Sequence, residues 1–178
     1  MSTEHKAVLL SIRPEWCVKI LNGEKTVEIR KNRPKLKPPF RCYIYCTKSA
    51  GRFAIPNADG KPVESAGKVI GEFTCDKIRF YSGKSWLVKE DIESVTAGSC
   101  LSLEQVKEYA GWRKAASFMD RKDLYAWHIS DLKVYDIPVE LSMIAALRKT
   151  KFGYEPVEIK KPPQSWCYVA EAEEDDAL

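Results

Sequence analysis

The sequence lacks any long hydrophobic run. None of its apolar stretches approaches the ~18–20 residues that a membrane-spanning helix requires, and residues 1–6 contain no apolar core of a signal peptide. Internal repeats, low-complexity segments and an obvious linker between domains are also missing. These absences argue against membrane insertion and secretion, and we expect a cytoplasmic protein.

Metal ligands are scarce or scattered. Two histidines, His5 and His128, accompany six cysteines, and no two cysteines form a C-x-x-C pair. A structural zinc site requires closer ligand pairs, so we expect no metal and no cofactor. Cys42 and Cys46 flank Ile44 on one face of a predicted strand, where thiols serve as small core residues. We expect the cysteines to be reduced, as in a cytoplasmic compartment.

The length and composition are those of one ordinary globular domain. A chain of 178 residues, 44% hydrophobic and 30% charged, can form one well-packed core and is short for two. Residues 171–178 carry five acids and no base. We therefore expect a single domain over residues 1–170, followed by an acidic disordered tail over residues 171–178.

Positive charge is concentrated near the start of the chain. Residues 1–48 carry a net charge of +7, although the whole chain carries only +4. Much of this excess lies in one proline-stiffened loop, whose cations are Lys31, Arg33, Lys35, Lys37 and Arg41. Such a loop suits the neutralisation of phosphate groups. The alternative is a solvated loop whose charges serve solubility.

The most informative segment is residues 23–30, Gly-Glu-Lys-Thr-Val-Glu-Ile-Arg. Its glycine is predicted to end a helix, after which a strand begins. Because side chains alternate along a strand, Glu28 and Arg30 share one face while Val27 and Ile29 face the core. Lys25 lies at the mouth of the strand and can reach the same polar face.

Charges at this density are costly to bury unless they are paired. We therefore expect Lys25, Glu28 and Arg30 to converge into a polar site near a helix terminus. The alternative is an exposed Glu–Arg pair that contributes ~0–1 kcal/mol and has no function.

The residues before this segment predict how it is positioned. Residues 9–14, Leu-Leu-Ser-Ile-Arg-Pro, indicate a short buried strand that ends at the proline opening the next element. From Pro14 to Asn22 the spacing of Trp16, Ile20 and Leu21 predicts a helix with one apolar face.

The run from Ser11-Ile12-Arg13-Pro14 to Arg30 resembles the ASCH (activating signal cointegrator 1 homology) domains of the PUA-like superfamily. Their signature is a glycine, a lysine two residues later, a glutamate three after that and an arginine two further on. Gly23, Lys25, Glu28 and Arg30 match every position. The resemblance extends more loosely over residues 7–170. It implies a mixed α/β, mainly β fold: a PUA-like small β-barrel with peripheral helices.

Patterning predicts the remaining elements. We expect strands at 40–47, 67–81, 124–134 and 165–169, with Tyr43 and Tyr45 on the opposite face from the cysteines of the first of these. Ser102 and Gln105 form a capping box that begins a helix through about Ala110. Short helices are predicted at 113–119 and 142–148, and a loop at 48–66 with a tight turn at Asp59-Gly60.

The resemblance implies a ligand cleft between the first helix and the barrel. Its candidate ligand-binding residues are Lys25, Glu28, Arg30, Arg13, Tyr45, Trp127 and His128, and the basic loop adds Lys31, Arg33, Lys35 and Lys37 for phosphate. Aromatic rings beside cations are suited to stacking on nucleobases. The alternative for each ring is plain core packing, and for the histidine a hydrogen-bonded position in the scaffold.

ASCH domains are considered nucleic-acid or nucleotide-binding modules, so the favoured function is binding of RNA or a modified nucleotide. The alternative is a small hydrolase, an amidohydrolase or ribonuclease, with Lys25 and Glu28 as its acid–base pair. One bacterial branch hydrolyses acetylcytidine with a lysine, a threonine three residues later and a distant glutamate. Here Glu28 occupies the threonine position, which argues against that covalent mechanism, and Glu104 and Glu108 are both candidates for the distant glutamate. A protein–protein adaptor is a third option, and the oligomeric state is open.

Overall fold

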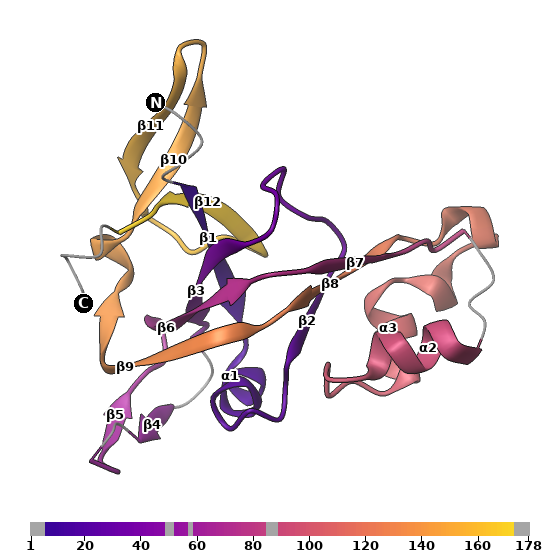
Figure 1. Ribbon diagram of the computed structural model, residues 1–178, viewed down its shortest axis with the longest axis horizontal. Helices are drawn as coiled ribbons and strands as arrows, with labels where there is room; N and C mark the ends of the chain where they lie inside the picture. The colour runs from indigo at the N-terminus through magenta and orange to yellow at the C-terminus, as the bar shows by residue number, and fades with distance from the viewer. Residues whose placement is uncertain (1–5, 49–51, 57–58, 85–88, 173–178) are drawn as a thin grey trace.

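The structure is a computed structural model that describes residues 6–48, 52–56, 59–84 and 89–172. It is mainly β, with helices packed beside the sheets (Figure 1). The strands are β1 (Lys6–Ile12), β2 (Val27–Arg30), β3 (Phe40–Cys46), β4 (Ala54–Pro56), β5 (Pro62–Glu64), β6 (Lys68–Cys75), β7 (Ile78–Tyr81), β8 (Leu124–His128), β9 (Ser130–Glu140), β10 (Ala145–Thr150), β11 (Gly153–Glu158) and β12 (Trp166–Ala170). The helices are α1 (Pro14–Leu21), α2 (Lys89–Thr96) and α3 (Leu103–Tyr109), and the 3-10 turns are η2 (Trp112–Lys114), η3 (Phe118–Asp120) and η4 (Leu141–Met143).

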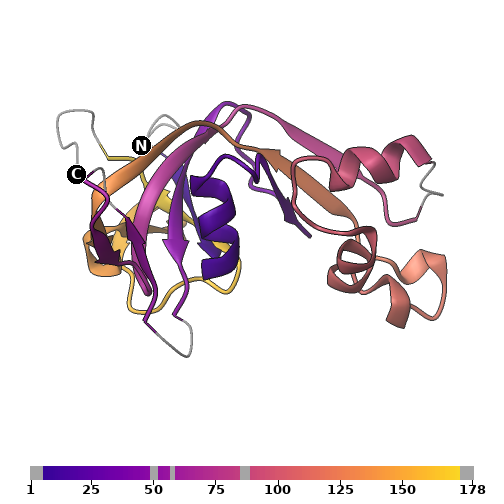
Figure 2. The same cartoon turned by 90° about the horizontal axis from the view of Figure 1, so that it is seen from below.

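The main sheet has seven strands in the order β11-β10-β12-β1-β3-β6-β9. At its centre β1 runs parallel to β3, with Val8 opposite Cys42, and antiparallel to β12, with Val8 opposite Tyr168. A second sheet has the order β2-β8-β7, and β4 and β5 form a separate hairpin. The chain passes from the main sheet into the second along β6–β7 and returns along β8–β9, so that α2 and α3 lie at a distance from the main sheet (Figure 2).

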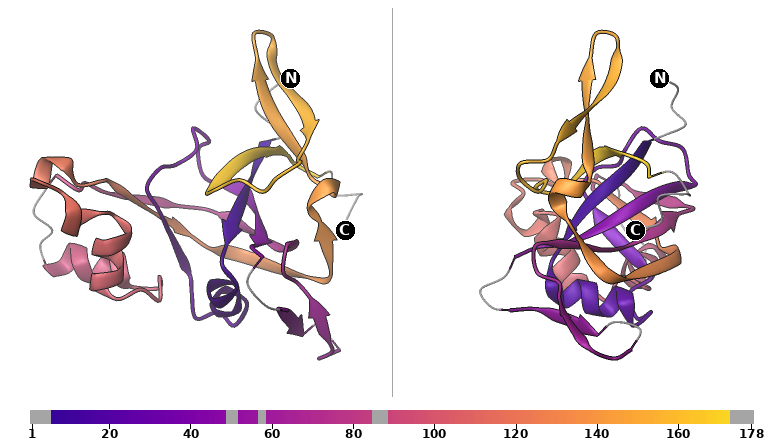
Figure 3. Two further views of the ribbon diagram at one scale, coloured as in Figure 1. Left: turned by 180° about the vertical axis from the view of Figure 1, so that it is seen from behind. Right: turned by 90° about the vertical axis from the view of Figure 1, so that its left-hand side faces the viewer.

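The mainly β architecture with peripheral helices agrees with the sequence-based expectation, but the expected barrel is not confirmed. The described strands form open sheets, and β11 and β9 are the edges of the main one. One reason why the sheet stays open is that β10 pairs with β12 at only one position, Ala146 opposite Val169. The β10–β11 hairpin therefore leaves the sheet and projects from the body of the molecule (Figure 3).

Both faces of the main sheet are buried at its centre, along β1 and β3. Cys42 and Cys46 belong to one core with residues of α1, whereas Tyr43 and Tyr45 belong to a second core on the other side. The predicted alternation along β3 is thus confirmed. A third core lies between the second sheet and the helices α2 and α3, and includes Ile29.

The helix predicted from Pro14 is confirmed as α1. The proline occupies the first turn, and Gly23 follows the helix with a φ of +73°. Such a left-handed conformation favours glycine because it lacks a Cβ. The capping box of Ser102 and Gln105 is also present and begins α3.

Several local predictions differ from the structure. The long strands predicted at 67–81 and 124–134 each divide near the passage between the two sheets. The helix predicted at 142–148 is wrong: this segment is η4 and β10, because Ala145–Thr150 pairs with β11. Residues 113–119 form separate 3-10 turns, and the loop at 48–66 contains the hairpin of β4 and β5. Helix α2 and strand β11 were not predicted.

The beginning of the predicted tail makes defined contacts. Glu171 forms an ion pair with Arg41, and the amide of Ala172 donates a hydrogen bond to the Tyr43 hydroxyl at 3.0 Å. Residues 173–178 lie outside the described residues. None of the described helices is long and apolar enough to span a membrane.

Candidate functional site

Strand β2 is fixed at its start by two distant parts of the chain. The Lys25 amide donates to the Lys19 carbonyl at the end of α1, at 2.9 Å. The amides of Thr26 and Val27 both donate to the Gly98 carbonyl, at 2.8 and 2.9 Å. A Cβ on residue 98 would lie 2.3 Å from Thr26 Oγ1, and its φ is +70°. Glycine is therefore required where the turn after α2 meets β2.

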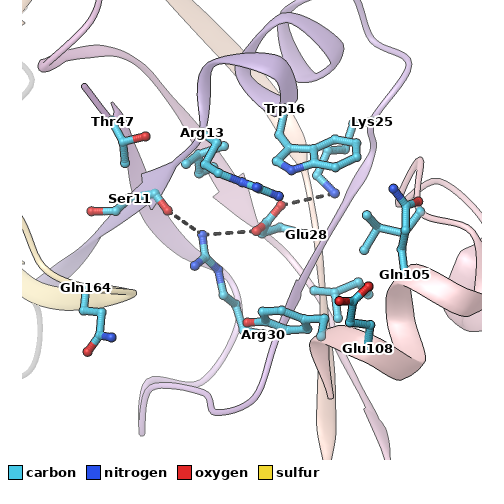
Figure 4. A pocket seen from close by; sticks show the side chains of 14 residues that line it. Ser11, Arg13, Trp16, Lys25, Glu28, Arg30, Thr47, Gln105, Glu108 and Gln164 are labelled. Atoms are coloured by element: carbon cyan, nitrogen blue, oxygen red, sulfur yellow. Dashed lines mark hydrogen bonds and ion pairs between the residues drawn. The ribbon is translucent and has the colours of Figure 1, made fainter. Parts of the chain in front are cut away.

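The two faces of β2 divide as the alternation predicts. Ile29 packs in the third core with Val106 and Leu124. Glu28 and Arg30 face the opposite way, toward the end of β1 and helix α1, and Lys25 reaches them from beyond the strand (Figure 4). One face of β2 thus packs in a core, and the opposite face carries the polar site.

Lys25, Glu28 and Arg30 form a buried ion-pair triad. Lys25 Nζ lies 3.2 Å from one oxygen of Glu28, and Arg30 Nη2 lies 3.1 Å from the other. Their side chains are 2%, 11% and 9% exposed, respectively. The convergence that the sequence predicted is therefore present, and the triad is largely removed from water.

Backbone carbonyls hold the two cations in place. Lys25 Nζ donates to the Ser99 carbonyl at 2.7 Å, and Arg30 Nη2 donates to the Ser11 carbonyl at 2.9 Å. Arg30 Nη1 also reaches Ser165 Oγ at 3.3 Å. Arg30 Nε is buried and has no hydrogen-bond partner among the described residues.

The triad carries a net charge of +1, because two cations share one carboxylate. An uncompensated buried charge is costly, and carbonyl dipoles compensate it only in part. The site therefore has a residual attraction for an anion or for a ligand rich in hydrogen-bond acceptors.

The triad forms the floor of an open cavity of about 560 Å³, within the range typical of small-ligand sites. Helix α1 contributes Trp16 to its walls, α3 contributes Gln105 and Glu108, and the loop before β12 contributes Gln164 (Figure 4). We refer to this cavity as the pocket. It lies between the first helix and the helical segment 89–110, with residues of β1 and β2 in its lining, whereas the sequence predicted a cleft between the first helix and a barrel.

Two further wall residues add charge and hydrogen-bonding capacity. Arg13 lines the pocket with a side chain that is 68% exposed and paired with Glu15 at 3.1 Å. Tyr109 lines the opposite wall, and its partial burial raises the pKa of its phenol. The hydroxyl of Tyr109 therefore remains protonated near neutral pH and is able to donate a hydrogen bond.

Three predicted ligand residues do not line the pocket. Tyr45 is buried in the second core, because the face of β3 that carries it is covered. Trp127 is fully buried and packs edge-on against Phe40. His128 lies at the passage between the sheets, where its Nδ1 is 2.6 Å from an oxygen of Asp76.

The predicted basic loop is divided between two places. Lys31 Nζ lies 4.7 Å from the centre of the Tyr109 ring, beside the pocket. Lys35 and Lys37 line a different hollow, and Arg33 is exposed and lines neither.

Sequence reasoning did not single out several pocket residues. Trp16 and Ser11 lie within the recognised N-terminal run, so their position beside the triad could have been suspected. Gln105, Tyr109 and Gln164 are distant in the sequence from the triad. The capping box predicted Gln105 at the start of its helix but not beside the pocket, and Tyr109 and Gln164 carry no local signal. Glu108 is one of the two glutamates that the sequence offers as the distant one, and it lines the pocket. The other, Glu104, pairs with Lys107 and Arg113 on the exposed side of α3.

Metal ligands do not gather at this site or elsewhere in the described part of the chain, where no group of three or more His, Cys, Asp or Glu side chains could hold an ion. All six cysteines are free thiols. The lining of the pocket supplies an amine, guanidinium groups, carboxylates, amides, hydroxyl groups and aromatic rings.

Comparison with known proteins identifies the family of the chain. The family model of the ASCH domain matches residues 10–170. The chain belongs to the ASCH family. Its fold is accordingly PUA-like, although the described sheets remain open.

Solved structures of ASCH proteins have the same fold. The ASCH protein from Zymomonas mobilis is 18% identical, with a TM-score of 0.52, over 95% of this chain and 89% of that one. A mutant of that protein with phenylalanine in place of tyrosine is 19% identical, with a TM-score of 0.52, over 91% and 88% of the two chains. A second mutant, with alanine in place of serine, is 18% identical, with a TM-score of 0.51, over 91% and 87%. The search of curated proteins gives no match.

Proposed function

We propose that the pocket of this ASCH domain binds one nucleotide unit of an RNA, or a free modified nucleotide. The observation that carries the proposal is the buried Lys25–Glu28–Arg30 triad on the floor of a cavity of about 560 Å³. A nucleobase edge presents donors and acceptors side by side, and so does this floor.

The triad retains hydrogen-bonding capacity for a ligand. Lysine has three donors, and Lys25 uses one on Ser99 and one on Glu28, which leaves one free. Each oxygen of Glu28 has one cationic partner and keeps a second lone pair. A base edge or a ribose hydroxyl is therefore able to donate to Glu28 while it accepts from Lys25.

The walls supply the other elements of nucleotide recognition. The rings of Trp16 and Tyr109 are available for stacking, which contributes ~1–3 kcal/mol per base at such sites. Gln164 presents a side-chain amide, and Gln105 can offer its amide NH2 group, because its Oε1 already accepts from the Ser102 amide in the capping box. Arg13 provides an exposed guanidinium suited to phosphate.

Replacement of the lysine provides the test. Lys25→Met removes the free donor but leaves Glu28 and Arg30 as a neutral pair, so we expect the protein to remain folded. Loss of a hydrogen bond from a charged group is equivalent to ~1.5–3 kcal/mol, and the affinity for nucleoside monophosphates and short RNAs should fall by at least tenfold. The affinity is measured by titration, with calorimetry or tryptophan fluorescence as the readout.

The matched control is Lys133→Met, which replaces an exposed lysine on β9, the far edge strand of the main sheet. Its affinity should equal that of the unaltered protein. Undiminished binding by a folded Lys25→Met variant, or no binding of any nucleotide or RNA by the unaltered protein, contradicts the proposal.

Hydrolysis is the second candidate function, and the position of Glu108 favours it. This carboxylate lines the same cavity as the Lys25–Glu28 pair, so the pocket contains more than one possible acid or base. Against it, both oxygens of Glu28 are already held by cations, which suits a fixed acceptor better than a base that abstracts protons.

Incubation with N4-acetylcytidine and short RNAs separates the two functions. Mass spectrometry detects any product. Binding of these ligands without product formation supports the binding module. Product formation that is lost in both Lys25→Ala and Glu28→Gln identifies a hydrolase instead.

A further inference from the structure

A second hollow lies at the N-terminal end of β1. Its volume is about 560 Å³, and its lining includes Lys6, Lys35, Lys37 and Arg41. We refer to it as the basic hollow. The cations come from two adjacent strands of the main sheet, β1 and β3, and from the proline-rich segment that precedes β3.

The basic hollow has a large excess of positive charge. Glu171 is the acid among its lining residues, and it is paired with Arg41 at 3.3 Å. No carboxylate in the described part of the chain forms an ion pair with Lys6, Lys35 or Lys37. The lining therefore carries a net charge of +3, unlike an ordinary surface on which both signs alternate.

The segment that carries these lysines is held against β12. The Lys35 amide donates to the Tyr168 hydroxyl at 2.7 Å, and Asn32 Oδ1 accepts from the Trp166 indole at 2.7 Å. Pro34 is buried between these contacts. Lys35 and Lys37 are exposed, but these contacts hold in position the backbone from which they extend.

Partly exposed aromatic rings lie beside the cations. The rings of Trp166 and Tyr168 are 5.4 Å apart, and those of Tyr168 and Tyr154 are 6.0 Å apart. Lys6 Nζ lies 3.6 Å from the centre of the Tyr154 ring. Cationic grooves with interleaved aromatic rings are typical of surfaces that bind single-stranded nucleic acid.

The same segment connects the basic hollow to the pocket. It leaves the pocket floor at Arg30, passes Lys31 beside Tyr109, and reaches Lys35 and Lys37. Seven residues span at most ~25 Å when fully extended. One strand of a few nucleotides is therefore long enough to reach from the pocket to the basic hollow.

We propose that this protein binds a single-stranded RNA with one nucleotide in the pocket and the flanking phosphates in the basic hollow. The proposal rests on the proposed function of the pocket. Charge complementarity selects the occupant, because a phosphodiester chain carries one negative charge at each nucleotide along the path that the lysines follow.

The test compares two ligand lengths and two matched pairs of substitutions. The ligands are a nucleoside monophosphate, which fills only the pocket, and a single-stranded RNA of ten nucleotides. Lys35→Gln with Lys37→Gln removes two cations from the basic hollow. Lys114→Gln with Lys133→Gln removes two exposed lysines elsewhere on the molecule. All four lysines are exposed, so both double variants should remain folded, which thermal melting checks.

We expect only the longer ligand to respond to the first double variant. Each phosphate contact with a single strand contributes ~0.7 to the steepness with which log K falls as log salt rises. Loss of two contacts should therefore make this dependence less steep by ~1.4. If the variant and the unaltered protein bind equally at 1 M salt, the variant should bind about 25-fold more weakly at about 0.1 M. The monophosphate should bind both double variants as tightly as the unaltered protein, and the control pair should leave the binding of the decamer unchanged.

Three results would overturn the proposal. In the first, the decamer binds the first double variant with the same affinity as the control pair. In the second, poly-glutamate of equal charge competes as strongly as the RNA, which indicates that the occupant is an acidic peptide. In the third, the decamer loses affinity but Lys25→Met has no effect on either ligand. The basic hollow then binds RNA by itself, and it is the assignment of the pocket that fails.

Discussion

At the scale of the residue, the pocket depends on Glu28, which stands between two buried cations. Glu28→Gln leaves Lys25 and Arg30 close together without a counter-charge. Breaking a buried ion pair by removing one partner typically costs ~3–5 kcal/mol. We expect a loss of this order in the free energy of unfolding, measured by urea denaturation at neutral pH.

The exposed pair of Arg148 and Glu155 on the β10–β11 hairpin provides the control. Glu155→Gln should cost ~0–1 kcal/mol, because its side chain is 50% exposed and water replaces the lost partner. Similar losses in the two variants would mean that the triad is far more hydrated than its burial indicates.

The residue scale also shows what strand alternation is able to predict. It placed Glu28 and Arg30 opposite Ile29 correctly, because β2 has one polar and one core-facing side. It did not exclude Tyr45, whose face was predicted correctly, because alternation does not tell whether a face is covered. Both faces of β3 are covered here, so its two tyrosines are core residues. Trp127 is buried for the same kind of reason, since other elements pack over its strand.

At the scale of the element, the helical segment 89–110 is attached to β2 through Gly98. Gly98→Ala combines a left-handed backbone, which costs roughly 1–2 kcal/mol, with a Cβ 2.3 Å from Thr26 Oγ1. Overpacking of that kind typically adds ~1–3 kcal/mol. We expect lower stability and weaker ligand binding, because the wall formed by α3 is displaced.

Gly111→Ala is the matched control for this substitution. Its φ of +71° is nearly the same, but a Cβ there would meet nothing within 4 Å. The backbone cost is therefore shared, and the difference between the two variants in urea denaturation measures the close approach to Thr26. Equal losses in the free energy of unfolding would show that Thr26 moves away from the added Cβ at no cost.

Elements with local signals were predictable and those defined by pairing were not. The proline, the apolar face and the glycine predicted α1, and the capping box predicted the start of α3. The segment 142–148 contains good helix formers such as Ala145, Leu147 and Arg148, which made a helix plausible. It is a strand because it pairs with β11, and such tertiary pairing overrides local propensity.

At the scale of the whole molecule, charge is distributed so that an acidic segment begins beside the basic hollow. Ala172, whose carbonyl accepts a hydrogen bond from Arg41, is followed by Glu173, Glu174, Asp175 and Asp176. Truncation after Ala172 removes these four negative charges and raises the formal net charge from +4 to +8. We expect the truncated chain to bind a ten-nucleotide RNA more tightly at low salt.

The salt dependence identifies the cause of this effect. The advantage of the truncated chain should be largest at 0.01 M salt, where charges act over ~30 Å, and should vanish near 1 M, where they act over ~3 Å. An unchanged affinity at low salt would show that the acidic residues do not influence the basic hollow.

The overall architecture was partly accessible from the sequence. The N-terminal signature led to the correct family, because its residues lie close together in the chain. The pocket as a whole was not accessible, since α3 and the loop before β12 reach it from far along the chain. The open sheets were also unexpected, because closure depends on how strand edges meet.

The contact between Lys25 Nζ and the carbonyl of Ser99 joins positions 74 residues apart. The amine on the floor of the pocket is thus held by the segment that supplies the opposite wall. If a ligand in the pocket stabilises this contact, the contact must increase the affinity for the ligand by the same free energy. A bound nucleotide should therefore slow amide hydrogen exchange across residues 93–110, including positions that the ligand never touches.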